Sequence, residues 1–153
     1  MNKKSVFILS GLMLGSAIFA APSEFSGWCP TQGDVKTKNP EVVKLAEKSM
    51  TLKGIKGREW IMFKAGGIKS EKGTTISITF TAAGKGKVFA GYYGYRQGFS
   101  LSKAEDTPLL LTDKPTAFKL EFPLASSVKI VRPRFRISPD AEITVSNHKV
   151  EIK

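Results

Sequence analysis

Cysteine and histidine are nearly absent from this sequence, which has one of each among its 153 residues. Cys29 has no partner for a disulfide bond within the chain. We therefore expect it at a buried apolar position, with an intermolecular disulfide as the alternative. His148 stands between Asn147 and Lys149 near the C-terminus, and we expect it on the solvated surface.

Motifs for catalysis are also missing. The chain has no pair of histidines or cysteines at metal-ligand spacing, no nucleophile elbow and no glycine loop that precedes a helix. Glu105 and Asp106 are adjacent carboxylates, which we expect in a solvated loop, whereas a glycosidase needs two carboxylates across a cleft. We predict that the protein is not an enzyme.

No apolar run is long enough to span a bilayer as a helix. The longest, from Val6 to Phe19, covers about 14 residues, whereas a spanning helix needs about 20. It follows Lys3 and Lys4 and ends at Ala20, the three-part layout of a secretory signal peptide. We predict a signal peptide over residues 1–20, no membrane span in the mature chain, and a secreted or periplasmic protein; an uncleaved anchor is the alternative.

Acidic residues are too few to balance the basic ones, 13 against 24, and the net charge is +11. Removing Lys3 and Lys4 with the signal peptide lowers it to +9. Such an excess favours anionic polymers, among them acidic glycans and envelope polysaccharide. Export argues against nucleic acid as a partner. The alternative is that the lysines only solvate the surface.

Helical periodicity is scarce as well. Asn39-Pro40-Glu41 resembles a helix start and predicts a brief helix through residues 42–46. From Ser49 onward apolar residues alternate with polar ones, most clearly over residues 75–81, in about eight short segments separated by turns. This pattern predicts an all-β fold, a two-sheet antiparallel β-sandwich. Since no repeat or linker interrupts it, we expect one domain over residues 21–153.

The order of features along the chain is similar to that of a known family. The features are Phe25 and Trp28, Ser49–Leu52, Trp60, Lys72–Phe80, a strand ending at Tyr95, Gly98-Phe99, Arg134–Ile137 and Ala141–Val145. Together they resemble the galactose-binding-like jelly rolls, in particular the carbohydrate-binding modules of bacterial polysaccharide-degrading enzymes. The resemblance implies a jelly roll, no catalysis, and sugar binding on aromatic side chains.

The resemblance fails at the position of a structural calcium ion. Such modules often carry an acidic pair in the last strand and an acidic residue after the first phenylalanine. Here the last strand reads Val145-Ser146-Asn147-His148, and Ser26 follows Phe25. Calcium prefers several oxygen ligands with carboxylate charge. We therefore expect no cofactor, and any ancestral calcium site to be weak or lost.

One strand is rich in aromatic residues. Over residues 88–96, alternation places Phe89, Tyr93 and Tyr95 on one face, with Arg96 at the end, and the smaller set of Val88, Ala90, Tyr92 and Gly94 on the other. If the smaller set faces the interior, the first forms an outer ridge on which pyranose rings stack, with a gap at Gly91. The alternative is that the larger set packs the core.

A second strand carries three arginines at spacing two, Arg132, Arg134 and Arg136. Their guanidinium groups suit carboxylate and sulfate and stack on aromatic rings. An internal partner, Glu121 or Asp113 on a neighbouring strand, is the alternative. Because Pro133 lacks a backbone donor, we expect this strand at a sheet edge or bulged.

These observations predict an exported, non-catalytic carbohydrate-binding protein, with acidic glycans among its ligands and these aromatic and arginine residues as its site. The alternative is a structural or assembly module that docks onto another cell-envelope protein, because a fold alone does not determine function.

Overall fold

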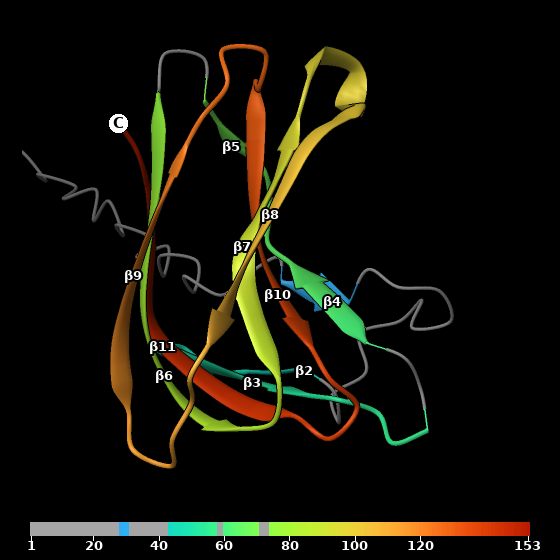
Figure 1. Cartoon of the computed structure of the whole chain (residues 1–153), viewed down its shortest axis with the longest axis vertical. Helices are drawn as coiled ribbons and strands as arrows, with labels where there is room; N and C mark the ends of the chain where they lie inside the picture. Colours follow the sequence, from blue (N-terminus) through green and yellow to red (C-terminus); the bar gives the residue numbers. More distant parts are fainter. Residues whose placement is uncertain (1–27, 31–42, 58–59, 71–73) are drawn as a thin grey trace, which may run out of the picture.

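The protein is built from antiparallel strands (Figure 1). The computed structural model describes residues 28–30, 43–57, 60–70 and 74–153. Its elements are β1 (Cys29–Pro30), β2 (Val43–Leu45), β3 (Ser49–Lys53), β4 (Ile61–Lys64), β5 (Ile68–Lys69), β6 (Thr75–Lys85), β7 (Val88–Tyr95), the 3-10 helix η1 (Gln97–Phe99), β8 (Leu101–Leu109), β9 (Thr116–Pro123), β10 (Ile130–Ile137) and β11 (Glu142–Ile152). The predicted signal peptide lies outside the described residues, as do Phe25 and Ser26. In the described part, no helix has the length and apolar character needed to cross a membrane.

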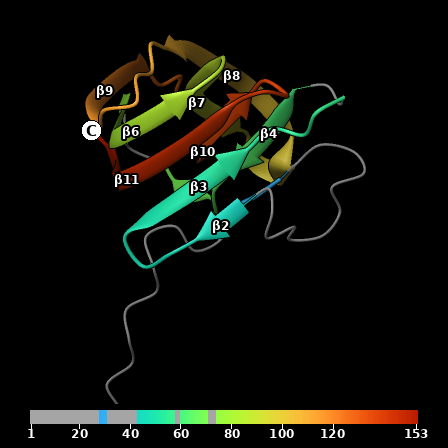
Figure 2. The same ribbon diagram turned by 90° about the horizontal axis from the view of Figure 1, so that it is seen from below.

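The strands form two sheets that face each other (Figures 1 and 2). Sheet I has the order β1-β4-β10-β7-β8, with β5 also paired to β10, and sheet II has the order β2-β3-β11-β6-β9. Consecutive strands stay in one sheet only from β2 to β3, from β4 to β5 and from β7 to β8, and every other step along the chain changes sheet. The predicted all-β, two-sheet antiparallel jelly roll is confirmed.

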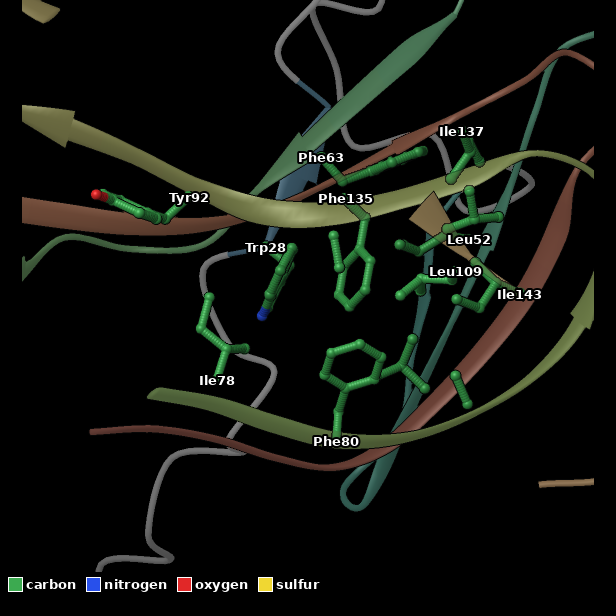
Figure 3. Packing of buried hydrophobic residues seen from close by; sticks show 14 of the residues in the cluster. Trp28, Leu52, Phe63, Ile78, Phe80, Tyr92, Leu109, Phe135, Ile137 and Ile143 are labelled. Atoms are coloured by element: carbon green, nitrogen blue, oxygen red, sulfur yellow. The ribbon is translucent and has the colours of Figure 1, made fainter. Parts of the chain in front are cut away.

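The core lies between the sheets and is centred on aromatic rings (Figure 3). Phe135 of sheet I meets Phe80 of sheet II edge to face, with ring centroids 5.2 Å apart. Trp28 packs against Phe135 at 5.3 Å. Because side chains of a strand alternate, each residue buried here leaves its neighbours on an outer face.

The predicted helix over residues 42–46 is wrong for its described part, residues 43–46, since Val43–Leu45 is the strand β2. Val43 pairs with Leu52 of β3, and Leu45 pairs with Met50. These contacts give the short segment backbone partners that an isolated single turn of helix lacks. Pairing at the sheet edge therefore overrides the local helix-start signal.

The expected surface position of His148 is also wrong. The side chain is 8% exposed and packs edge-on against Trp28, with ring centroids 5.3 Å apart. The cause is a bulge in β11, where the register shifts between Ser146 and Lys149 and Asn147 has a φ of 52°. The extra residue reverses the alternation, so that inward positions change from odd to even numbers and His148 turns into the core.

Pro133 does not mark a sheet edge, because β10 lies in the middle of sheet I, between β4 and β7. The carbonyl of Pro133 accepts a hydrogen bond from the backbone N–H of Ala65. The nitrogen of Pro133 points to the same side, where the neighbouring strand is interrupted between β4 and β5. The missing donor therefore lies opposite a break in the sheet, which lets proline occupy a central strand.

Candidate functional site

The outer face of sheet I gathers the aromatic and arginine residues singled out from the sequence. Val88, Ala90 and Tyr92 are buried, so Phe89, Tyr93 and Tyr95 point outward, as the first alternative predicts. In the register of β7 with β10, Arg132 lies opposite Tyr93, and Arg136 lies opposite Phe89. Directly opposite residues share a face. We call this surface the arginine–aromatic face; its members are Trp60, Phe89, Tyr93, Tyr95, Arg132, Arg134 and Arg136.

Tyr93 lies across the sheet rather than standing out from it. Its ring covers the guanidinium of Arg134, with Cζ 4.4 Å from the ring centroid. Its hydroxyl donates a hydrogen bond to Sδ of Met62, on a strand beyond β10. Arg134 is only 7% exposed beneath the ring. One face of the Tyr93 ring is therefore held against a cation, and the other is directed away from the sheet.

Arg136 is flanked by two aromatic side chains. Its Cζ lies 4.8 Å from the ring centroid of Trp60 and 4.5 Å from that of Phe89. The two rings are themselves 5.4 Å apart. Trp60 directly precedes β4, and its alternation with the buried Ile61 and Phe63 places it on the outer side. That alternation is the sequence signal that could have added Trp60 to the predicted site.

Asp106 neutralises part of the arginine charge. Its Oδ1 lies 2.9 Å from Nη2 of Arg134, and its Oδ2 lies 3.0 Å from Nε of Arg136. These are ion-pair contacts, because Oδ1 of Asp106 and Nε of Arg136 have hydrogen-bond geometry with no described residue. The expected loop position of Glu105 and Asp106 is wrong, since both lie in β8.

The internal partners considered from the sequence lie elsewhere. Glu121 pairs with Lys119 and Lys153 on sheet II. Asp113 lines a shallow groove beside Lys85 and Glu142. Neither carboxylate reaches the arginine–aromatic face. The sequence reasoning missed Asp106 because β8 has no apolar alternation that would identify it as a strand.

Gly91 leaves the gap in the aromatic row, and that gap has a structural use. Nε and Nη2 of Arg134 donate to the carbonyl oxygen of Glu105 at 3.1 and 3.0 Å. A Cβ at position 91 would collide with this carbonyl oxygen. Only glycine leaves room for the backbone acceptor that holds Arg134 under Tyr93.

Arg132 and Tyr95 form the remaining part of the face. Cζ of Arg132 lies 5.6 Å from the Tyr95 ring centroid, and the rings of Tyr95 and Tyr93 are 6.1 Å apart. Burial raises the pKa of the Tyr95 hydroxyl, against the lowering effect of Arg132, so the group remains a neutral donor at physiological pH. Arg96 is exposed after the end of β7 and lies outside the row of arginines on β10.

The outer face of sheet II is different in kind. Its described outward residues are mainly hydroxyl and charged side chains, such as Thr51 beside Thr144 and the pair of Lys149 with Glu151. No group of three or more His, Cys, Asp or Glu able to hold a metal ion occurs among the described residues. The aromatic side chains that could stack on a ligand are therefore concentrated on sheet I.

No protein-family model matches the sequence, and neither does any curated protein. Solved structures do match in fold. The enzymatically active domain of the bacteriophage CBA120 tailspike protein 4 superposes with a TM-score of 0.65 at 14% identity, over 86% of this chain and 20% of that one. The chain thus spans about a fifth of the tailspike structure that it matches.

Two neighbours are domains of nearly the same size. The N-terminal cellulose-binding domain of Cellulomonas fimi β-1,4-glucanase C matches with a TM-score of 0.54 at 14% identity, over 83% of this chain and 89% of that one. The xylan-binding domain CBM22-1 from Paenibacillus barcinonensis matches with a TM-score of 0.53 at 11% identity, over 85% and 88%. At these identities the likeness establishes the fold: the chain has the jelly roll of carbohydrate-binding modules, as the sequence resemblance predicted.

Proposed function

We propose that this protein is an exported, non-catalytic carbohydrate-binding module that binds glycan on the arginine–aromatic face. The observation that carries the proposal is the Tyr93 ring, held over Arg134 by contacts to two other strands. The Tyr95 ring lies beside it, with centroids 6.1 Å apart and a tilt of 57° between the ring planes, so the two rings form an angled surface.

Stacking on a sugar needs an apolar ring face in a fixed position. A pyranose presents C–H groups on its flat side, which pack on aromatic faces, while its hydroxyls bond to polar groups at the rim. The Tyr93 ring already has its orientation before a ligand arrives, so little side-chain freedom is lost on binding. The partly exposed Arg132 and Arg136 provide positive charge beside the rings, and a planar guanidinium also stacks on them.

The structural neighbours support the same assignment. Two of those that match along most of their own length are described as a cellulose-binding and a xylan-binding domain. The chain matches only small parts of two larger proteins, the tailspike domain and an α-L-arabinofuranosidase, 20% and 23% of their lengths. This proportion fits an accessory module better than a catalytic unit, and it supports the absence of catalysis proposed from the sequence.

Export forms part of the proposal and rests on the N-terminal sequence. Cleavage after Ala20 would leave Ala21 at the mature N-terminus. Intact mass spectrometry of the protein from its producing cell tests this step. A membrane-embedded species that retains residues 1–20 would overturn the proposed secreted or periplasmic location.

Binding is tested with an array of neutral and acidic glycans, followed by calorimetry on the ligands found. Tyr93→Ala should weaken every glycan about fivefold to tenfold, because stacking does not depend on ligand charge. Thr81→Ala, on β6 of the other sheet, is the matched control and should bind as the parent does. Circular dichroism must show both variants folded. A folded Tyr93→Ala variant with unchanged affinity for all glycans would refute the proposed platform.

Docking onto another envelope protein is the second candidate, favoured by the edge of sheet I. β8 ends the strand order, and the apolar side chains of Leu101 and Leu110 are 51% and 88% exposed at its start and just beyond its end. An edge strand offers unpaired backbone groups to a partner strand. This candidate gains if no glycan binds and if Leu101→Lys prevents recovery of a partner protein from the producing cell.

A further inference from the structure

We propose that Arg132 recognises an anionic group, a carboxylate or a sulfate, on the bound glycan, so that acidic polysaccharides are the preferred ligands. This inference rests on the proposed function, since it places the anionic group beside sugar rings stacked on Tyr93 and Tyr95.

The charges of the arginine–aromatic face are unequally neutralised. Asp106 forms ion pairs with both Arg134 and Arg136. Arg134 is further occupied by the carbonyl of Glu105 and is covered by Tyr93. Arg132 forms no ion pair with a described residue, and its buried Nε has no hydrogen-bond acceptor among them. The excess positive charge therefore lies at the Arg132 end of the face.

The position of Arg132 suits a ligand on the platform. Its backbone lies opposite Tyr93 in the strand register, and its guanidinium lies 5.6 Å from the ring centroid of Tyr95. The guanidinium packs over the Tyr95 ring, so a sugar stacked beside this pair would bring an anionic substituent within its reach. A guanidinium binds carboxylate or sulfate through two parallel hydrogen bonds, which a lysine cannot match.

The neighbouring loop leaves the Nη end of this guanidinium accessible, whereas its Nε is buried. A Cβ at Gly67 would lie 3.7 Å from Nε of Arg132, so a side chain there would reach over the arginine. Gly66 and Gly67 are both exposed, and a Cβ at Gly66 would meet no atom within 4 Å. Two glycines beside an unneutralised, half-buried arginine leave an open approach for an anion.

The test uses matched pairs of glycans that differ in charge alone. Oligogalacturonate and its methyl ester represent the carboxylate, and sulfated and desulfated galactan oligosaccharides represent the sulfate. We expect the parent protein to bind the charged member of at least one pair about tenfold more tightly, as charge-assisted hydrogen bonds would provide. Which pair shows the difference distinguishes carboxylate from sulfate.

The variants are Arg132→Gln and, as a control, Lys85→Gln. Both remove one positive charge, but Lys85 is exposed on sheet II, at the end of β6. Arg132→Gln should lose about tenfold in affinity for the charged member and keep its affinity for the neutral one, whereas Lys85→Gln should change neither appreciably. Added salt should weaken binding of the charged member by the parent and have little effect on the neutral one.

Failure of this inference is distinguishable from failure of the proposed function. If the parent binds neutral and charged members equally and Arg132→Gln changes neither, the anionic site is refuted while glycan binding stands. If the parent binds only neutral glycans, the anionic site is likewise refuted while glycan binding stands. If neither these pairs nor the glycan array yields a ligand, the proposed function itself fails.

Discussion

Lowering the pH from about 7.5 to about 5 should destabilise the fold through one buried imidazole, that of His148. The ring packs against Trp28 and lies 6.4 Å from Phe80 and 6.3 Å from Phe135. Burial among these rings lowers the pKa of His148 from 6.5 to about 4. A lowering of this size corresponds to about 3 kcal/mol between the two protonation states.

The direction of the effect follows from which state takes up the proton. Between pH 6.5 and 4 the unfolded chain binds a proton at this residue and the folded protein does not. The free energy of unfolding therefore decreases as the pH is lowered. The contribution of His148 to the free energy of unfolding is fully present above pH 6.5. About 2 kcal/mol of it is lost by pH 5, and all of it is lost below pH 4. The lowered pKa values of Glu121, Asp140 and Glu151 affect stability only below their ordinary values of 3.8 to 4.5.

Urea unfolding at pH 7.5, 6.5 and 5 measures this prediction. The variant His148→Phe keeps an aromatic ring among Trp28, Phe80 and Phe135 but cannot titrate, so its stability should stay nearly constant over the range. The reasoning is refuted if the parent is as stable at pH 5 as at pH 7.5. It is also refuted if the variant loses as much stability as the parent.

Three further predictions concern the contacts that hold Arg134 beneath Tyr93 and the expected absence of a calcium site. Asp106→Asn should lower the free energy of unfolding by about 3–5 kcal/mol, because it leaves the buried guanidinium of Arg134 without its charge partner. The control Glu121→Gln, at an exposed ion pair, should stay within about 1 kcal/mol of the parent. Equal effects of the two variants in urea unfolding would contradict the buried pair. Gly91→Ala should destabilise by about 1–3 kcal/mol because its methyl group meets the carbonyl of Glu105, and a parent-like unfolding curve would show that β8 can move away. Chelation with EDTA should leave the melting temperature unchanged, since we expect no calcium site, and a fall of several degrees would show a bound ion.

The strands whose periodicity was regular could be predicted from the sequence, and alternation divided the residues of β7 into two sets, but it left open which set faces the core. In β7 the smaller residues Val88 and Ala90 are buried, and Tyr93 and Tyr95 point outward. Alternation works there because one side of the strand faces the core along its whole length. The same logic placed three arginines together on one face of β10.

The errors arose where a tertiary contact decides the local structure. The bulge at Asn147 turns His148 inward, and its signal in the sequence is the change of apolar positions from Ile143 and Val145 to Val150 and Ile152. The ion pairs of Asp106 could not be predicted, because they depend on β8 lying beside β7. Short-range patterns predict which side chains of a strand share a face, but they do not predict which strands become neighbours.

The central claim is that glycan binds on the arginine–aromatic face, and backbone NMR tests it most directly. The isotope-labelled protein is titrated with a glycan found on the array, and amide shift changes are mapped onto both sheets. We expect the largest changes along β7 and β10, around Tyr93 and Arg132, together with the indole N–H of Trp60, while the indole N–H of the buried Trp28 and the outer positions of β6 and β11 stay unchanged. Saturable changes confined to sheet II or to the β8 edge would contradict the account.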